Sequence, residues 1–154
     1  MEPAGLRVLS VTEAGVPNEA AWRILEARGV AIHRIRLSGL HDGASRIARK
    51  IGRYLPPAHI LKTIVDAADR FDPHLVHMGT GRPVVLAVLR ALGGRKALPM
   101  AIEQGAIGGV NALSPIDWLT FYSRRISRVI VPSYAPVNQW IGSWSHSRLG
   151  AKAE

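Results

Sequence analysis

The sequence contains no cysteine, and this absence removes several chemistries at once. Disulfide bonds, cysteine-ligated zinc, iron–sulfur clusters and a thiol nucleophile all need that residue. Long apolar runs are missing too, because no segment approaches the roughly 18 consecutive apolar residues that cross a bilayer. We therefore expect a protein without a membrane-spanning helix that relies on a hydrophobic core for its stability.

Negative charge is also scarce. Asp and Glu number 11 against 20 Lys and Arg, which gives a formal net charge of +9. A basic surface favours anionic partners, such as nucleic acid, a phosphate-bearing metabolite or an anionic membrane surface. Basic and aromatic residues are not interleaved, and no nucleic-acid-reading motif occurs. We therefore do not expect a nucleic-acid partner.

What the chain does contain is apolar patterning. Apolar residues form 47% of 154 residues, enough to bury the core of about one domain. The N-terminus lacks the charged and apolar regions of a secretory signal, so we expect a cytoplasmic protein. Residues 44–55 place Arg46, Arg49, Lys50 and Arg53 on one side of a helical pattern. This pattern leaves peripheral contact with the inner membrane face open, although a solvated helix face explains it as well.

Strand and helix patterns alternate from the N-terminus onward. Leu6–Val11 is β-rich, Glu19–Arg28 has apolar residues at helical spacing, and Val30–Leu37 alternates as a strand does. Gly29 is expected to stop the helix. A strand, a helix and a second strand within about thirty residues predict a βαβ unit, whose strands lie parallel.

The alternation continues along the rest of the chain. Further strands are predicted at His74–Met78, Leu98–Glu103 and Arg128–Val131. The remaining helices are expected at Ala58–Phe71, Pro83–Leu92, Ser114–Ile126 and Pro136–Ile141. Five strands alternating with helices predict an α/β domain with a doubly wound, mainly parallel, Rossmann-like sheet. The first and third strands are the most continuously apolar, and we expect them at its centre.

The phosphate-binding motifs of common nucleotide-binding domains are missing. Residues 79–81 read Gly-Thr-Gly after the third strand, but Val84 stands where the dinucleotide motif needs its third glycine. No Walker-type loop with glycine, lysine and serine or threonine occurs. His74 and His77 are three apart on a strand and point to opposite faces, so they cannot share one ion. We therefore expect no cofactor and no metal site.

Polar residues near the strand ends are the candidates for binding. Ligands of a doubly wound sheet sit beyond the carboxyl ends of its strands. His77, Glu103 and Gln104 are predicted there, and the segment Gly105–Asp117 opens with three glycines in five residues. Such glycines allow a close approach of backbone N–H groups to a ligand. A structural histidine and an ordinary connecting loop explain the same residues, so both interpretations stay open.

Three segments carry patterns that recur together in one protein family. Leu6–Leu37 contains Leu-Glu-Ala-Arg-Gly before its second strand, Phe71–Gly79 reads FDPHLVHMG, and Tyr122–Ser133 reads YSRRISRVIVPS. Together they resemble the N-terminal domain of family 4 (group 1) glycosyltransferases, whose motifs there are "alarGHeV", "PDvVHahg" and "ADrvIavS". Order and spacing agree over residues 6–142. The resemblance implies that residues 1–142 form one half of a GT-B architecture, followed by a polar tail at 143–154.

The resemblance also implies what this half does. It is similar to an acceptor-binding domain that faces a second domain holding a nucleotide-activated sugar, which serves as co-substrate. Gly15 would lie near the donor phosphates, and no catalytic residue is implied. The cleft on the acceptor side would be lined by His77, Glu103, Gln104, Gly105 and Ser133.

The family's donor-binding domain, with its E-x7-E motif, has no counterpart in this sequence. Glu19 and Glu26 are seven apart on the first helix and do not replace that motif. We therefore expect either a truncated chain that is inactive alone, or one that needs a partner supplying the donor-binding domain. Trp140, Ile141 and Trp144 have no evident core to enter and are expected to face that domain. The alternative is a non-catalytic α/β binding module for an anionic ligand or partner.

Overall fold

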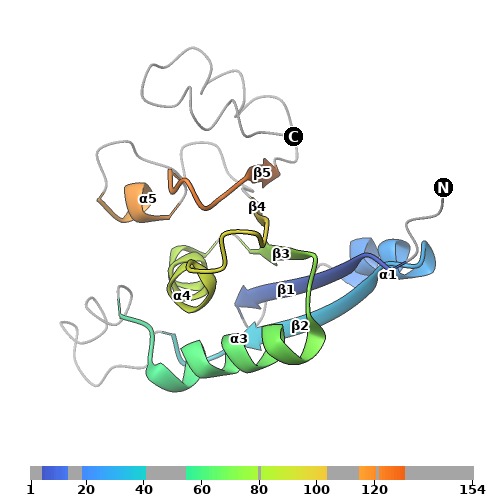
Figure 1. The fold of residues 1–154 in the computed structure, drawn as a ribbon, viewed down its shortest axis with the longest axis horizontal. Coiled ribbons are helices and arrows are strands. Elements are labelled where there is room, and N and C mark those ends of the chain that lie inside the picture. Colours follow the sequence, from blue (N-terminus) through green and yellow to red (C-terminus); the bar gives the residue numbers. More distant parts are fainter. Residues whose placement is uncertain are drawn as a thin grey trace, which may run out of the picture.

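Strands and helices alternate along the chain as the sequence predicts (Figure 1). The computed structural model describes residues 5–13, 19–40, 55–79, 81–103, 115–120 and 122–130. Their strands are β1 (Arg7–Glu13), β2 (Ala31–Leu37), β3 (Leu75–Met78), β4 (Met100–Glu103) and β5 (Arg128–Ile130). Their helices are α1 (Glu19–Ala27), α3 (Ala58–Phe71), α4 (Arg82–Leu92) and α5 (Pro115–Leu119).

The strands form a parallel sheet in the order β2-β1-β3-β4-β5. β1 pairs with β2 on one side and with β3 on the other, so the chain reverses its direction of travel across the sheet. The doubly wound, Rossmann-like α/β class is therefore confirmed, and β1 and β3 lie inside the sheet as predicted. A sheet of this order has a switch point at the carboxyl ends of β1 and β3, where such folds bind ligands.

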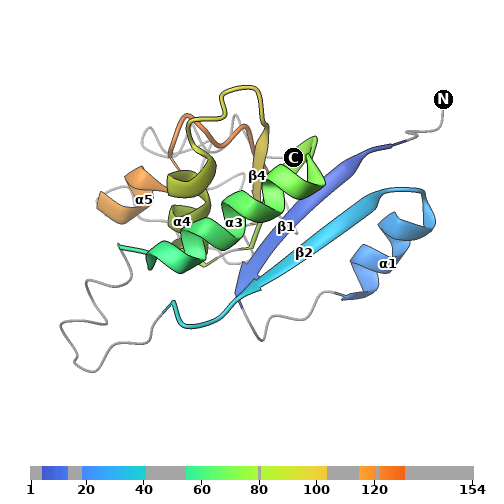
Figure 2. The ribbon, with the colours of Figure 1, turned by 60° about the horizontal axis from the view of Figure 1, so that its bottom comes forward.

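Two neighbouring residues of β2 show which helices cover which face of the sheet. The His33 ring lies 5.4 Å from the Phe71 ring of α3, centroid to centroid. The Arg34 guanidinium instead donates to Glu26 of α1 at 2.6 Å. Successive side chains of a strand point to opposite faces. α3 and α4, which pack against each other, therefore lie on one face and α1 on the other (Figure 2).

The face toward α3 and α4 holds the hydrophobic core. The three inner strands contribute the fully buried side chains of Leu9, Val11, Val76, Met78, Met100 and Ile102. Ile60 and Ile64 of α3 and Val84 and Val88 of α4 pack onto them. The spacing of four places each pair on one side of its helix. Full burial of such a side chain stabilises a protein by roughly 1.5–3 kcal/mol, so this layer dominates the stability of the fold.

Left-handed residues end two of the helices. Gly29 has φ of +83° directly after the last turn of α1, as the sequence predicts. Asp72 ends α3 with φ of +48°, a conformation that is uncommon for a residue with a side chain. Its N–H donates to the Ala68 carbonyl at 2.9 Å, and its carboxylate pairs with Arg7 at 2.6 Å. These two bonds hold the turn that leads α3 into β3.

The helix predicted over Ser114–Ile126 is shorter than expected, because α5 ends at Leu119. Long-range bonds draw the following residues toward the start of β4. The Ser127 N–H and hydroxyl both donate to the Met100 carbonyl at 2.9 Å, and the Arg125 guanidinium donates to the Arg95 carbonyl at 2.7 Å. The local sequence pattern holds no trace of these bonds, so the prediction was wrong at this point.

Several expected segments lie outside the described residues. They are residues 44–54 of the basic stretch at 44–55, the last predicted helix at 136–141 and the tail at 143–154. The last two include Trp140, Ile141 and Trp144. Within the part of the chain that the structure describes, no helix combines the length and the apolar character needed to cross a membrane.

Candidate functional site

The carboxyl ends of β1 and β3 meet at the switch point of the sheet. Gly79 follows β3 and donates its N–H to the Val11 carbonyl at 3.0 Å, which joins the two strand ends. Glu13 ends β1, and its Oε2 lies 3.3 Å from the place that a Cβ on Gly81 would take. Gly81 is the N-cap of α4. The absence of a side chain at 81 therefore lets a carboxylate approach a helix N-terminus, where negative charge is favourable.

A partly buried ion pair lies beside this edge. Arg82, the first residue of α4, donates its Nε to Asp117 Oδ1 and its Nη2 to Oδ2 at 3.2 Å. Asp117 is fully buried in α5, whereas the Arg82 side chain is 38% exposed. The bidentate geometry ties the start of α4 to α5. Burial raises the pKa of Tyr122, and the charge of Asp117 adds to this effect.

The face of the sheet toward α1 carries a cluster centred on His77. The Ser10 hydroxyl lies 3.2 Å from His77 Nδ1, and both side chains are buried. Trp22 of α1 packs edge-on against the imidazole, with ring centroids 4.9 Å apart. On the other side, Glu103 Oε2 lies 3.7 Å from His77 Nε2. Three strands and one helix thus fix a histidine that is 7% exposed.

Glu103 is an accessible polar member of this cluster, since its side chain is 38% exposed. It ends β4, so its carboxylate lies at the carboxyl edge of the sheet. The His77 imidazole lowers the pKa of Glu103, and partial burial of the carboxylate opposes this effect. Glu103 is therefore ionised at neutral pH and offers hydrogen-bond acceptors only.

A cavity of about 410 Å³ adjoins the cluster on the α1 face. His77 and Glu103 are the polar members of its described lining. The other described lining residues are apolar or aromatic, namely Leu6, Val8, Trp22, Leu25, Val30, Leu75 and Ile130. We call this cavity the α1 groove. Its size and its few convergent polar groups are those of a small-molecule site.

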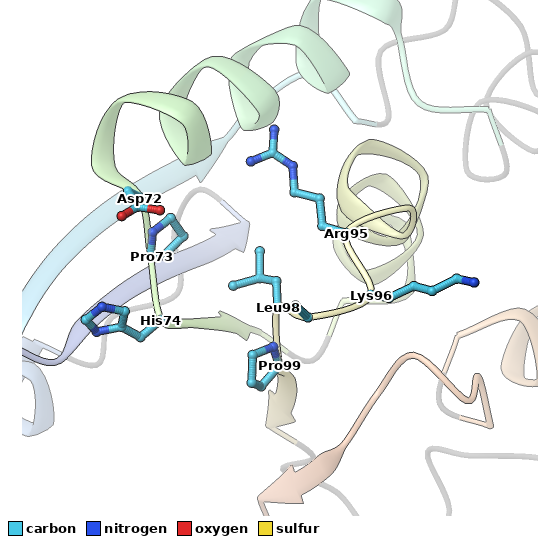
Figure 3. A pocket seen from close by; sticks show the side chains of 8 residues that line it. Asp72, Pro73, His74, Arg95, Lys96, Leu98 and Pro99 are labelled. Atoms are coloured by element: carbon cyan, nitrogen blue, oxygen red, sulfur yellow. The ribbon is translucent and has the colours of Figure 1, made fainter.

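A second cavity, of about 550 Å³, opens at the opposite end of the sheet (Figure 3). It lies between Asp72–His74 and Arg95–Pro99, at the amino ends of β3 and β4. Arg95 pairs with Asp69 at 2.5 Å, and Lys96 extends away from the other labelled side chains. Parallel sheets of this type bind ligands at their carboxyl ends, so we do not regard this cavity as the candidate site.

The structure brings together two of the residues selected from the sequence. His77 and Glu103 face each other across neighbouring strands. His77 points to the α1 face, one residue before the end of β3. The other selected residues, Gly15, Gln104, Gly105 and Ser133, lie outside the described residues.

Sequence reasoning did not single out the other groups of the His77 cluster or the ion pair beside it. Ser10 and Arg82 sit in ordinary strand and helix patterns, and Trp22 was interpreted only as an apolar position of a helix. Their partners lie 35 to 67 positions away in the chain, as for Arg82 with Asp117 and Ser10 with His77. A single sequence carries no signal for such contacts. The Ser10–His77 pair follows from the register of β1 and β3, which only the structure gives.

The described side chains do not form a metal-binding cluster. Among them, no cluster of three or more His, Asp or Glu residues is arranged to hold a metal ion. Comparison with protein-family models, curated proteins and solved structures finds no match for this chain.

Proposed function

We propose that this chain is the acceptor-binding half of a retaining glycosyltransferase of the GT-B type. The observation that supports the proposal is the placement of the three family-like segments. Leu6–Leu37 forms β1, α1 and β2, Phe71–Gly79 contains β3, and the described part of the third segment contains β5. They follow one another within one doubly wound sheet, which is the architecture that the resemblance implies.

The His77–Glu103 pair gives the proposal its chemistry. Glu103 lies at the carboxyl edge, where its ionised carboxylate accepts a hydrogen bond from an acceptor hydroxyl. His77 holds this carboxylate in place from the interior. Glycosyl transfer depends on positioning the acceptor and on stabilising the departing nucleotide diphosphate. This half supplies the positioning, and a donor-binding domain, in a partner or elsewhere in the same protein, holds the nucleotide-sugar.

An activity assay with and without a donor-binding domain tests the proposal. The purified chain alone is expected to release no UDP or GDP from UDP-glucose or GDP-mannose. Co-expression with the donor-binding domain of a GT-B transferase is expected to give transfer to an added acceptor. His77→Ala and Glu103→Ala then lower the rate roughly tenfold or more, as expected when positioning is lost.

Lys62→Ala is the matched control, because Lys62 is an exposed residue of α3 on the opposite face of the sheet. Its rate should equal that of the unchanged chain. Robust transfer by the isolated chain would overturn the proposal, since all catalytic groups would then be present in this half. Equal rates for the His77, Glu103 and Lys62 variants would remove the role given to the pair.

The net charge of +9 favours a second candidate, a non-catalytic module that binds an anionic ligand or partner. This function predicts binding of an anion such as pyrophosphate without any need for a donor-binding domain. It also predicts that no nucleotide-sugar is consumed when such a domain is supplied. The co-expression assay therefore separates the two functions.

A further inference from the structure

The α1 groove has an apolar end and a polar end. Val8 and Leu75, which pair across β1 and β3, line it toward the amino ends of the strands. Glu103 lies at its other end, at the carboxyl edge of β4. Trp22 of α1 borders one side and Ile130 of β5 borders the other. The groove therefore runs along the strands and ends where the sheet offers a carboxylate.

Apolar side chains on both sides of the groove remain open to solvent in the described structure. Leu25 of α1 is 36% exposed and Ile130 of β5 is 41% exposed. Of the described helices, α1 packs on this face and contacts β2, while α3, α4 and α5 lie on the other face. Exposed apolar surface next to a well-formed cavity is typical of a site that takes an apolar ligand.

The polar end of the α1 groove is suited to an uncharged ligand group that donates a hydrogen bond. Glu103 Oε2 is 3.7 Å from His77 Nε2, which is longer than a direct hydrogen bond. Its carboxylate is partly exposed, so its oxygens are open to a ligand hydroxyl. A carboxylate or phosphate head would meet the negative charge of Glu103 and be repelled.

We propose that the α1 groove binds an amphiphilic alcohol, with its apolar body along β1 and β3 and its hydroxyl head at Glu103. The volume of about 410 Å³ lies within the range of sites that enclose a drug-sized molecule. That this alcohol is the sugar acceptor rests on the proposed function, whereas the binding itself does not. The arrangement presents the hydroxyl at the carboxyl edge, which is where a nucleotide-sugar would approach it.

Calorimetric titration of the full chain with three probes tests the proposal. The probes are n-octyl glucoside below its micelle concentration, free glucose, and octanoate. Octyl glucoside is expected to bind with one-to-one stoichiometry and roughly tenfold or more tighter than glucose, because only the former buries an alkyl chain. Octanoate is expected to bind more weakly than octyl glucoside, because its head is repelled by Glu103.

Two variants locate the binding. Leu25→Trp fills the groove from α1 and is expected to weaken octyl glucoside binding roughly tenfold. Leu119→Trp is the control, because Leu119 is a 60% exposed residue of α5, away from the groove. Glu103→Leu is expected to weaken octyl glucoside and to strengthen octanoate, a reversal that general damage to the fold would not produce.

The proposal is overturned if the full chain binds none of the probes, if glucose binds as tightly as octyl glucoside, or if Leu25→Trp binds like Leu119→Trp. Failure of the proposed function has a different signature. In that case octyl glucoside still binds in the groove, and the glycosyltransferase assay yields no transfer to it when a donor-binding domain is present.

Discussion

His77 takes its properties from side chains on three other elements. Ser10 of β1 holds Nδ1, Trp22 of α1 packs against the ring, and Glu103 of β4 faces Nε2. The imidazole is nearly inaccessible to water, so these neighbours set its orientation. A fixed imidazole in turn determines which side of the Glu103 carboxylate is left for a ligand.

Removal of the Ser10 hydroxyl tests this view. We expect Ser10→Ala to lower the free energy of unfolding by about 1 kcal/mol, because the buried Nδ1 of His77 loses its partner. Urea denaturation measures the change. Thr63→Ala is the control, since the exposed Thr63 hydroxyl donates only to the His59 carbonyl within α3. Equal changes in the free energy of unfolding for the two variants would show that the buried Ser10–His77 hydrogen bond stabilises the fold no more than the exposed one.

Glu103 makes the stability depend on pH. Its pKa is lowered in the folded protein from the ordinary value of 4.5, so the ionised carboxylate stabilises the folded state above that value. This contribution is lost as the pH falls through the lowered pKa. We expect Glu103→Gln to cost at most about 0.5 kcal/mol near neutral pH, because the pair is partly screened by water. The difference, measured by urea denaturation, should shrink as the pH falls below 4.5 and through the lowered pKa. If the variant remained less stable than the unchanged chain at low pH, the loss would come from packing and not from the charge of Glu103.

The sequence was sufficient to select His77 and Glu103 but not to bring them together. Both were chosen because they stand near the ends of predicted strands, and this rule needs only local pattern. Their contact depends on the register in which Met78 pairs with Ile102, which no local pattern fixes. The Arg82–Asp117 pair was missed for the same reason, because it joins residues 35 positions apart.

At the scale of elements, periodicity predicted most of the fold. α3 has the predicted bounds, and the strands differ from prediction by a few residues at their ends. The success reflects strands and helices that bury one clear face each, as Ile60 and Ile64 do in α3. The predicted length of α5 was wrong because Arg125 and Ser127, which follow the helix, donate hydrogen bonds to carbonyl groups before and at the start of β4.

At the scale of elements, the ion pair that attaches α5 to α4 is expected to contribute most to the free energy of unfolding. Arg82→Ala leaves the carboxylate of the fully buried Asp117 without its bidentate partner, and we expect a loss of about 2–4 kcal/mol. The double variant Arg82→Ala/Asp117→Asn should recover part of this loss, because no buried charge remains. Hydrogen exchange in α5 and urea denaturation measure both effects. A single variant as stable as the unchanged chain would show that the pair does not hold α5.

At the scale of the molecule, the excess of positive charge is a property of the whole surface. We expect pyrophosphate to bind weakly at 0.1 M salt and roughly tenfold or more weakly still at 1 M, since the screening length falls from about 10 to about 3 Å. Octyl glucoside is the neutral control, and its binding should not weaken with salt. Calorimetry measures the binding. If pyrophosphate bound equally well at both salt concentrations, its binding would not be purely electrostatic.

The outermost strands of the described sheet have a consequence for how this chain behaves in crowded solution. β2 carries Arg34 and Arg36 on one face, and β5 has three residues, of which Arg128 is exposed. A sheet edge is a template onto which a second chain can add its own strand, and brevity and positive charge both discourage this addition. The net charge of +9 also makes two copies repel each other. Among the described strands, both edges thus carry features that discourage strand addition, while the exposed apolar side chains of the α1 groove lie on a face of the sheet.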